Sequence, residues 1–135
     1  MDVTMLLCDA AEEAGGKLYI LGGGWSVLQH PNLPTPMALA IMISVPWDQS
    51  NTRHTIAVRL VTEDGDDVDQ GGGAIRVDGE IEVGRPPGIK PGTPLDAPVV
   101  LKFGPLVLDA GGYVWELEID DAPVARTPFR VLGER

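Results

Sequence analysis

Glycine and proline interrupt this chain so often that long helices are excluded. The 135 residues include 17 glycines and 12 prolines. Both residue types end regular segments, because glycine is too flexible and proline lacks a backbone donor. The short segments that remain between them are typical of an all-β domain. The length suits one hydrophobic core, so we expect a single domain over residues 1–135.

Period-two alternation predicts half-buried strands at 54–61, 75–83 and 113–119. In the second of these, Gly79 interrupts the apolar row and predicts a bulge or a close backbone approach. Segments apolar on both faces, at 3–8, 18–21 and 39–45, are typical of buried strands or of short buried helices. The β-branched residues Ile41, Ile43 and Val45 predict a central strand for the last of these. Further short strands are expected at 99–103, 106–108 and 128–132.

About eight strands predict an antiparallel β-sandwich of immunoglobulin-like or jelly-roll type. The Pro-rich segments 30–36 and 85–92 are expected to cross between the sheets, and only 9–14 has the pattern of a helical turn. The residues expected in the core are Leu18, Ile20, Ile41, Ile43, Ile56, Val58, Val77, Ile81, Trp115, Leu117 and Ile119.

The charge pattern disfavours two classes of partner. The formal net charge is −10 and the ten Lys and Arg residues are scattered, whereas nucleic acids and anionic membranes require clustered basic residues. The N-terminus carries Asp2 where a signal peptide would be basic, and its apolar run ends at Asp9. We therefore expect a cytoplasmic protein, or a virion protein if a phage encodes it, with no nucleic-acid or membrane partner.

An acidic loop and two tryptophans are candidate binding sites. Asp64, Asp66, Asp67 and Asp69 offer the oxygen ligands that calcium prefers, although the spacing is not that of an EF-hand. A solvated hairpin end explains the same residues, so calcium is a possible cofactor only. Trp25 and Trp47 stand at strand ends beside Gly or Pro, where a ring can contact sugar or protein or can plug the core.

No catalytic residue and no obligatory cofactor is predicted. Cys8 lies in an apolar row, where a thiol is usually buried and inert, and His30 and His54 have no ligand partner nearby in the sequence. Gly22-Gly23-Gly24 follows a strand, but no helix that would complete a phosphate loop follows it. These residues are better explained by a bulge or a distorted edge.

Several short segments resemble an uncharacterised family of small, mostly actinobacterial proteins that contain a domain of unknown function. The resemblance covers nearly the whole chain and implies no activity or site. It is carried by Asp9-Ala10-Ala11, by Gly16-Lys17-Leu18-Tyr19-Ile20-Leu21-Gly22-Gly23-Gly24-Trp25, by Val45-Pro46-Trp47-Asp48-Gln49, by Val83-Gly84-Arg85-Pro86-Pro87-Gly88, and by Phe103-Gly104-Pro105-Leu106.

The leading functional hypothesis is a non-catalytic binding or assembly module, because a sandwich has edge strands that can add a strand from a protein partner or from a second copy. A structural component of a larger particle, such as a phage capsid decoration, is one form of it. The alternatives are a calcium- or glycan-binding domain and, least favoured, an enzyme whose site is assembled from distant residues.

Overall fold

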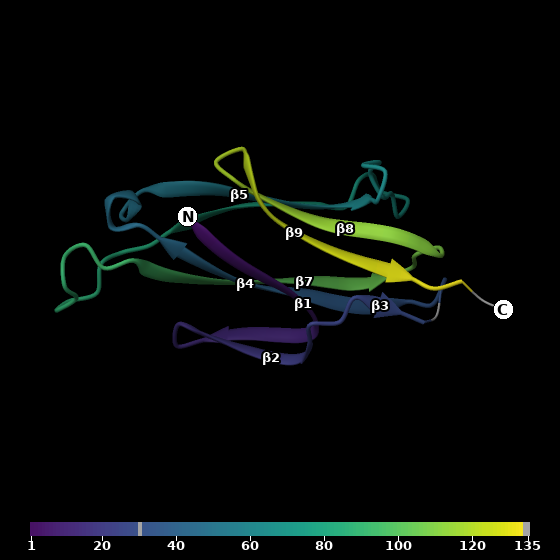
Figure 1. Cartoon of the computed structure of the whole chain (residues 1–135), viewed down its shortest axis with the longest axis horizontal. Coiled ribbons are helices and arrows are strands. Elements are labelled where there is room, and N and C mark those ends of the chain that lie inside the picture. Colours follow the sequence, from purple (N-terminus) through teal and green to yellow (C-terminus); the bar gives the residue numbers. More distant parts are fainter. Residues whose placement is uncertain (30, 134–135) are drawn as a thin grey trace.

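The computed structural model describes residues 1–29 and 31–133, which form nine strands and one 3-10 turn, η1 (Figure 1). Glycine-containing turns separate several of the strands, and Gly15 and Gly16, with φ of 59° and 77°, form the turn between the first two. The elements are β1 (Asp2–Ala14), β2 (Lys17–Gly23), β3 (Val27–Leu28), β4 (Thr35–Val45), η1 (Trp47–Gln49), β5 (Arg53–Thr62), β6 (Arg76–Glu82), β7 (Leu95–Leu106), β8 (Gly111–Ile119) and β9 (Ala122–Val131).

The strands form two sheets that pack face to face, which confirms the predicted β-sandwich. One sheet has the strand order β2-β1-β4-β7 and the other β3-β9-β8-β5-β6. All pairs are antiparallel except the short pair of β3 with β9, which is parallel. In the described part of the chain, no helix is long and apolar enough to cross a membrane.

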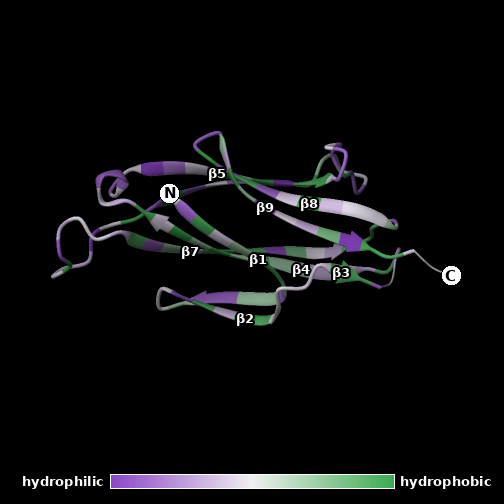
Figure 2. Cartoon of the chain, viewed as in Figure 1, coloured by the Kyte–Doolittle hydropathy of each residue, from purple (hydrophilic) through white to green (hydrophobic). Residues whose placement is uncertain are grey.

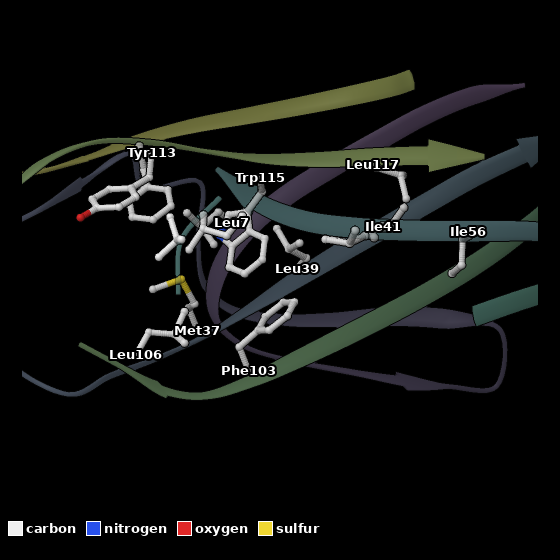
Figure 3. Packing of buried hydrophobic residues seen from close by; sticks show 14 of the residues in the cluster. Leu7, Met37, Leu39, Ile41, Ile56, Phe103, Leu106, Tyr113, Trp115 and Leu117 are labelled. Atoms are coloured by element: carbon white, nitrogen blue, oxygen red, sulfur yellow. The ribbon is translucent and has the colours of Figure 1, made fainter. Parts of the chain in front are cut away.

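Strand β4 lies between β1 and β7, as predicted for a central strand. Its alternate residues point into the space between the sheets, where they meet the inner faces of β5 and β8 (Figure 3). The aromatic rings of Phe103 and Trp115 stack across this space with centroids 4.3 Å apart. The largest fully buried side chains include Trp115, Leu7, Met37, Leu39, Ile41, Ile43, Leu60 and Leu117.

The prediction of a helical turn at 9–14 is wrong, because these residues continue β1. Strand β1 pairs with β4 only as far as Cys8 and then turns back, so that Asp9–Ala14 and β2 form a hairpin beneath β4 and β7 (Figure 1). The hairpin packs Ala11 and Leu18 against the outer face of the first sheet, on Cys8, Ala38, Ala40 and Val100. Tertiary packing here overrides the local helical preference of alanine and glutamate.

Two core assignments and several strand bounds also differ from expectation. Ile20 is 42% exposed and Leu18 lies in the small cluster under the hairpin, because β2 is outside the sandwich. The segments 99–103 and 106–108 are not separate strands, since β7 runs without a break from Leu95 to Leu106. Proline is tolerated at Pro98 because β7 is an edge strand. The short strand β3 was not predicted.

Strand β9 binds the segment around β3 to the second sheet. The amides of Arg130 and Leu132 donate to the carbonyls of Ser26 and Leu28, at 2.9 and 2.8 Å. The rings of Trp25 and Phe129 meet edge to face, 5.8 Å apart. These contacts close the side of the sandwich on which β3 lies.

Truncation of Trp115 tests how far the fold depends on the packing between the two sheets. We expect Trp115→Ala to lower the free energy of unfolding by about 3–5 kcal/mol, because it removes a buried ring and leaves a cavity. Leu33→Ala, at a side chain that is 55% exposed, should change it by less than about 0.5 kcal/mol. Urea unfolding followed by fluorescence measures both, and equal effects of the two variants would contradict the assignment of Trp115 to the core.

Candidate functional site

Strand β2 carries the most exposed apolar surface on the described part of the chain. Tyr19 is 57% exposed, Ile20 42% and Leu21 72%. With Ala10 and Ala11 of β1, these side chains line a shallow hollow of about 280 Å³. Figure 2 shows apolar residues of β2 in the outermost layer, separated from the sandwich core by β4 and β7. Tyr19 and Leu21 share one face of β2, because successive strand side chains point to opposite faces, and exposed apolar side chains on one face mark contact sites.

The backbone around β2 explains why this strand stays outside. A side chain at Gly22 would collide with the carboxylate of Asp9, and one at Gly23 would lie 2.8 Å from Ile20 Cγ2. The amide of Gly24 donates to the carbonyl of Leu7 at 2.8 Å. The glycines therefore let the chain pass close over the bend of β1. At the other end, Lys102 Nζ of β7 donates to Glu12 and fastens the hairpin.

A buried histidine, His54, lies near the start of β5. His54 Nδ1 lies 2.7 Å from Asp120 Oδ2, and its Nε2 lies 2.8 Å from the carbonyl oxygen of Gln49. Neither partner has a hydrogen to give, so both ring nitrogens donate and the ring is an imidazolium. The hydrogen bond to the Gln49 carbonyl, and then that to Asp120, raise the pKa of His54. The hydrogen bond from His54 also lowers the pKa of Asp120.

Asp120 holds a strained turn as well as the histidine. Asp120 and Asp121 have φ of 51° and 66° in the two-residue connection between β8 and β9, a backbone region that favours glycine. The Asp120 side chain also accepts the amide of Thr55 at 3.0 Å. The bonds to His54 and Thr55 therefore give this aspartate a structural role.

Two of the sequence motifs meet beside this histidine. The guanidinium of Arg85 lies 3.9 Å from the ring centroid of Trp47 and donates to the Trp47 carbonyl at 2.9 Å. Arg85 Nε also donates to Ser50 Oγ at 2.8 Å, and Ser50 Oγ donates to the Trp47 carbonyl at 2.6 Å. Because His54 Nε2 faces the carbonyl of Gln49, these residues do not form a serine–histidine–aspartate triad.

The other predicted site residues are not brought together. Asp69 Oδ1 accepts the amides of Gly71 and Gly73, at 2.7 and 3.1 Å, and so folds its own loop. Within residues 1–29 and 31–133, no three His, Cys, Asp or Glu side chains form a group that could hold a metal ion, so Asp64, Asp66, Asp67 and Asp69 do not converge. Trp25 is half-buried against Phe129. His30 lies outside the described residues.

The fold and its surfaces define a two-sheet β-sandwich that carries an apolar hairpin on the outside of one sheet. Residues 3–132 match a family of unknown function, DUF6941, and the chain belongs to this family. No curated protein matches the chain.

The pH dependence of stability tests the state of His54. Its folded pKa is raised above the ordinary 6.5, so its stabilisation is complete below that value and is lost as pH rises through the folded pKa. The folded pKa of Asp120 is lowered below 3.8, so its contribution is present above that value and is lost as pH falls through the folded pKa.

We expect the free energy of unfolding in urea to fall as the pH rises above about 6.5 in the native protein. In His54→Gln the fall should be smaller, because the glutamine side chain does not titrate in this range. Equal slopes in the two proteins would contradict the imidazolium assignment.

Cys8 should be inert. Its Sγ lies 3.3 Å from the Ala38 carbonyl between the first sheet and the hairpin, and burial followed by the charge of Asp9 raises its pKa. We expect a disulfide reagent to label the native thiol at least about a hundredfold more slowly than the urea-unfolded thiol. Absorbance of the released thiolate measures both rates. Similar rates would mean that the hairpin leaves Cys8 accessible.

Proposed function

We propose that the protein is a non-catalytic binding or assembly module that adds a strand of a protein partner to the outer edge of β2. The supporting observation is that this edge is unpaired in the described structure and carries Tyr19, Ile20 and Leu21 at its centre. Main-chain hydrogen bonds along the edge supply affinity in strand addition, and alternate side chains supply specificity.

A comparison of the edges favours β2 as the site. Natural proteins protect edge strands with charges, prolines or short length. Strand β7 has Pro98 and Pro105, and β3 has only two residues. The four charged residues of β6 disfavour any added strand that does not carry complementary charges. Strand β2 has no proline and no acidic residue, and Lys17 is its one charge. It lacks the features that prevent pairing with another chain.

The expected affinity is modest. Covering the side chains of Tyr19 and Leu21 contributes on the order of 1–2 kcal/mol each by burial of apolar area. Seven residues make an interface smaller than the roughly 1,200–2,000 Å² of stable complexes. Such a contact is transient when it is single, and strong when many copies bind in an array. This size suits either a regulated complex or a component of a larger particle.

The proposed partner is a polypeptide, which can be another protein or a second copy of this chain. Antiparallel pairing of β2 with β2 of another copy gives a symmetric contact in which the same surface is used twice. The proposal places the protein in the cytoplasm or in a virion, in keeping with its acidic composition.

Position-specific photo-crosslinking in the native host tests the proposal. A photoreactive phenylalanine analogue at Leu21 should give a crosslinked product of discrete mass, because under the proposal this side chain lies beside the strand added by the partner. The same analogue at Val107, which is 43% exposed on another surface, should give none. The product at Leu21 should be lost in Tyr19→Lys, since lysine at this position removes the apolar contact.

The mass of the product identifies the partner. Twice the mass of the chain would show self-association, and another mass would show a different protein. The same product at Leu21 and Val107, or a product insensitive to Tyr19→Lys, would overturn the proposal.

A further inference from the structure

A second surface lies between the edge strands β6 and β7, where the two sheets part. A hollow of about 700 Å³ opens there, with an apolar floor that belongs to the main core. A further hollow of about 470 Å³ continues it along β6 and shares Ile81 and Val99 with the first. We call the two together the lateral groove. Its apolar floor consists of Ile56, Val77, Ile81, Val83, Ala97, Val99 and Leu101.

The lateral groove exists because one inward-facing position of β6 has no side chain. Val77, Gly79 and Ile81 pair with Val58, Ile56 and His54 of β5, and the register continues through Gly79 without a shift. The predicted bulge at Gly79 is therefore wrong. A Cβ at Gly79 would lie 3.6 Å from Ile56 Cγ1, which is an ordinary contact. Neither the backbone nor a close neighbour requires glycine here, and its effect is to leave the floor open.

The rim of the lateral groove is acidic. The one cation that lines it is Lys102, which is already paired with Glu12. Arg76 and Arg53 pair with Asp78 and Glu82, at 3.0 and 3.7 Å. Among the described residues, Glu80 and Asp96 have no cation within ion-pair distance. The carboxylates along the rim are Glu12, Glu13, Asp78, Glu80, Glu82 and Asp96.

The two faces of β6 define what an added strand would need. Its outward side chains between Arg76 and Glu82 are Asp78, Glu80 and Glu82, while its inward row faces the apolar floor. A strand that pairs with β6 would place alternate side chains beside the carboxylates and the others on the floor, because strand side chains alternate with period two. The complementary strand therefore alternates basic and apolar residues.

We propose that the lateral groove binds an extended segment of a partner protein in which Lys or Arg alternates with apolar residues, paired along β6. This site is distinct from the outer edge of β2, because neither Tyr19 nor Leu21 lines it, although the hairpin contributes Glu12 and Glu13 to its rim. The acidic rim attracts the basic side chains, and the opening at Gly79 receives one apolar side chain against Ile56.

Titration with a defined peptide tests the site. The probe is an end-capped, fluorescently labelled eight-residue peptide that alternates valine and lysine, and the readout is its anisotropy with the full-length protein. We expect saturable binding that weakens as salt increases, since exposed charges are screened. A peptide of the same composition with its four lysines together should bind at least about tenfold more weakly, because it lacks the alternation.

Two variants locate the binding. Gly79→Val fills the floor and should weaken binding at least about tenfold without lowering the melting temperature. Its matched control is Gly72→Val, at a glycine with no atom within 4 Å and an ordinary φ. Glu80→Lys reverses an exposed rim charge and should weaken binding about tenfold, so it supplies a second measurement if Gly79→Val does not fold. Leu21→Lys should bind the peptide like the native protein.

Three results would overturn the proposal. They are an absence of binding at millimolar peptide, equal affinity for the alternating and block peptides, and an affinity unchanged by Gly79→Val or Glu80→Lys in folded protein. The two proposals are tested separately, because crosslinking at Leu21 tests the β2 edge and peptide binding tests the lateral groove. Either result can be negative while the other is positive.

Discussion

The structure depends on the unequal faces of β4. Its inward row, from Met37 to Val45, is large and apolar and fills the space between the sheets. Its outward row includes Ala38 and Ala40, which are small enough for the hairpin to lie directly on the sheet. Large residues on one face build the sandwich, and small residues on the other admit an additional layer. The position of β2, and hence its exposed edge, follows from this alternation.

The two proposed surfaces have opposite chemistry, and each suits a different kind of strand. The β2 edge is apolar and almost uncharged, so its selectivity rests on shape and on backbone pairing. The β6 edge is acidic, so its association rate and its selectivity respond to ionic strength. The two edges lie on different sheets, so the two proposals together would let one molecule join two partners.

The sequence predicted features that depend on local alternation. The central strand with Ile41 and Ile43, and the half-buried strand of Trp115 and Leu117, were found because period two is visible within a few residues. The bend in β1 was not found, because residues 9–14 are locally compatible with a helix and only packing on Ala38 and Ala40 selects a strand. Ile20 was assigned to the core because an apolar strand on the outside looks the same as a buried one.

The candidate sites were harder to predict because they join distant positions. His54 and Asp120 are 66 residues apart, and no pattern in the sequence pairs them. The lateral groove depends on which strands are edges, and strand order is not encoded in periodicity. In the sequence Gly79 is only an interruption of an apolar row, and its effect on the groove depends on the position of Ile56 in the fold.

The attachment of β3 and Trp25 to β9 also affects how the domain is made. During synthesis the ribosome releases Trp25 and β3 long before Phe129 and Arg130, which supply their closing contacts. Part of the apolar surface of the N-terminal strands therefore stays exposed to solvent until β9 has been synthesised. Such late, long-range closure slows folding and exposes the nascent chain to aggregation until the final strand has emerged.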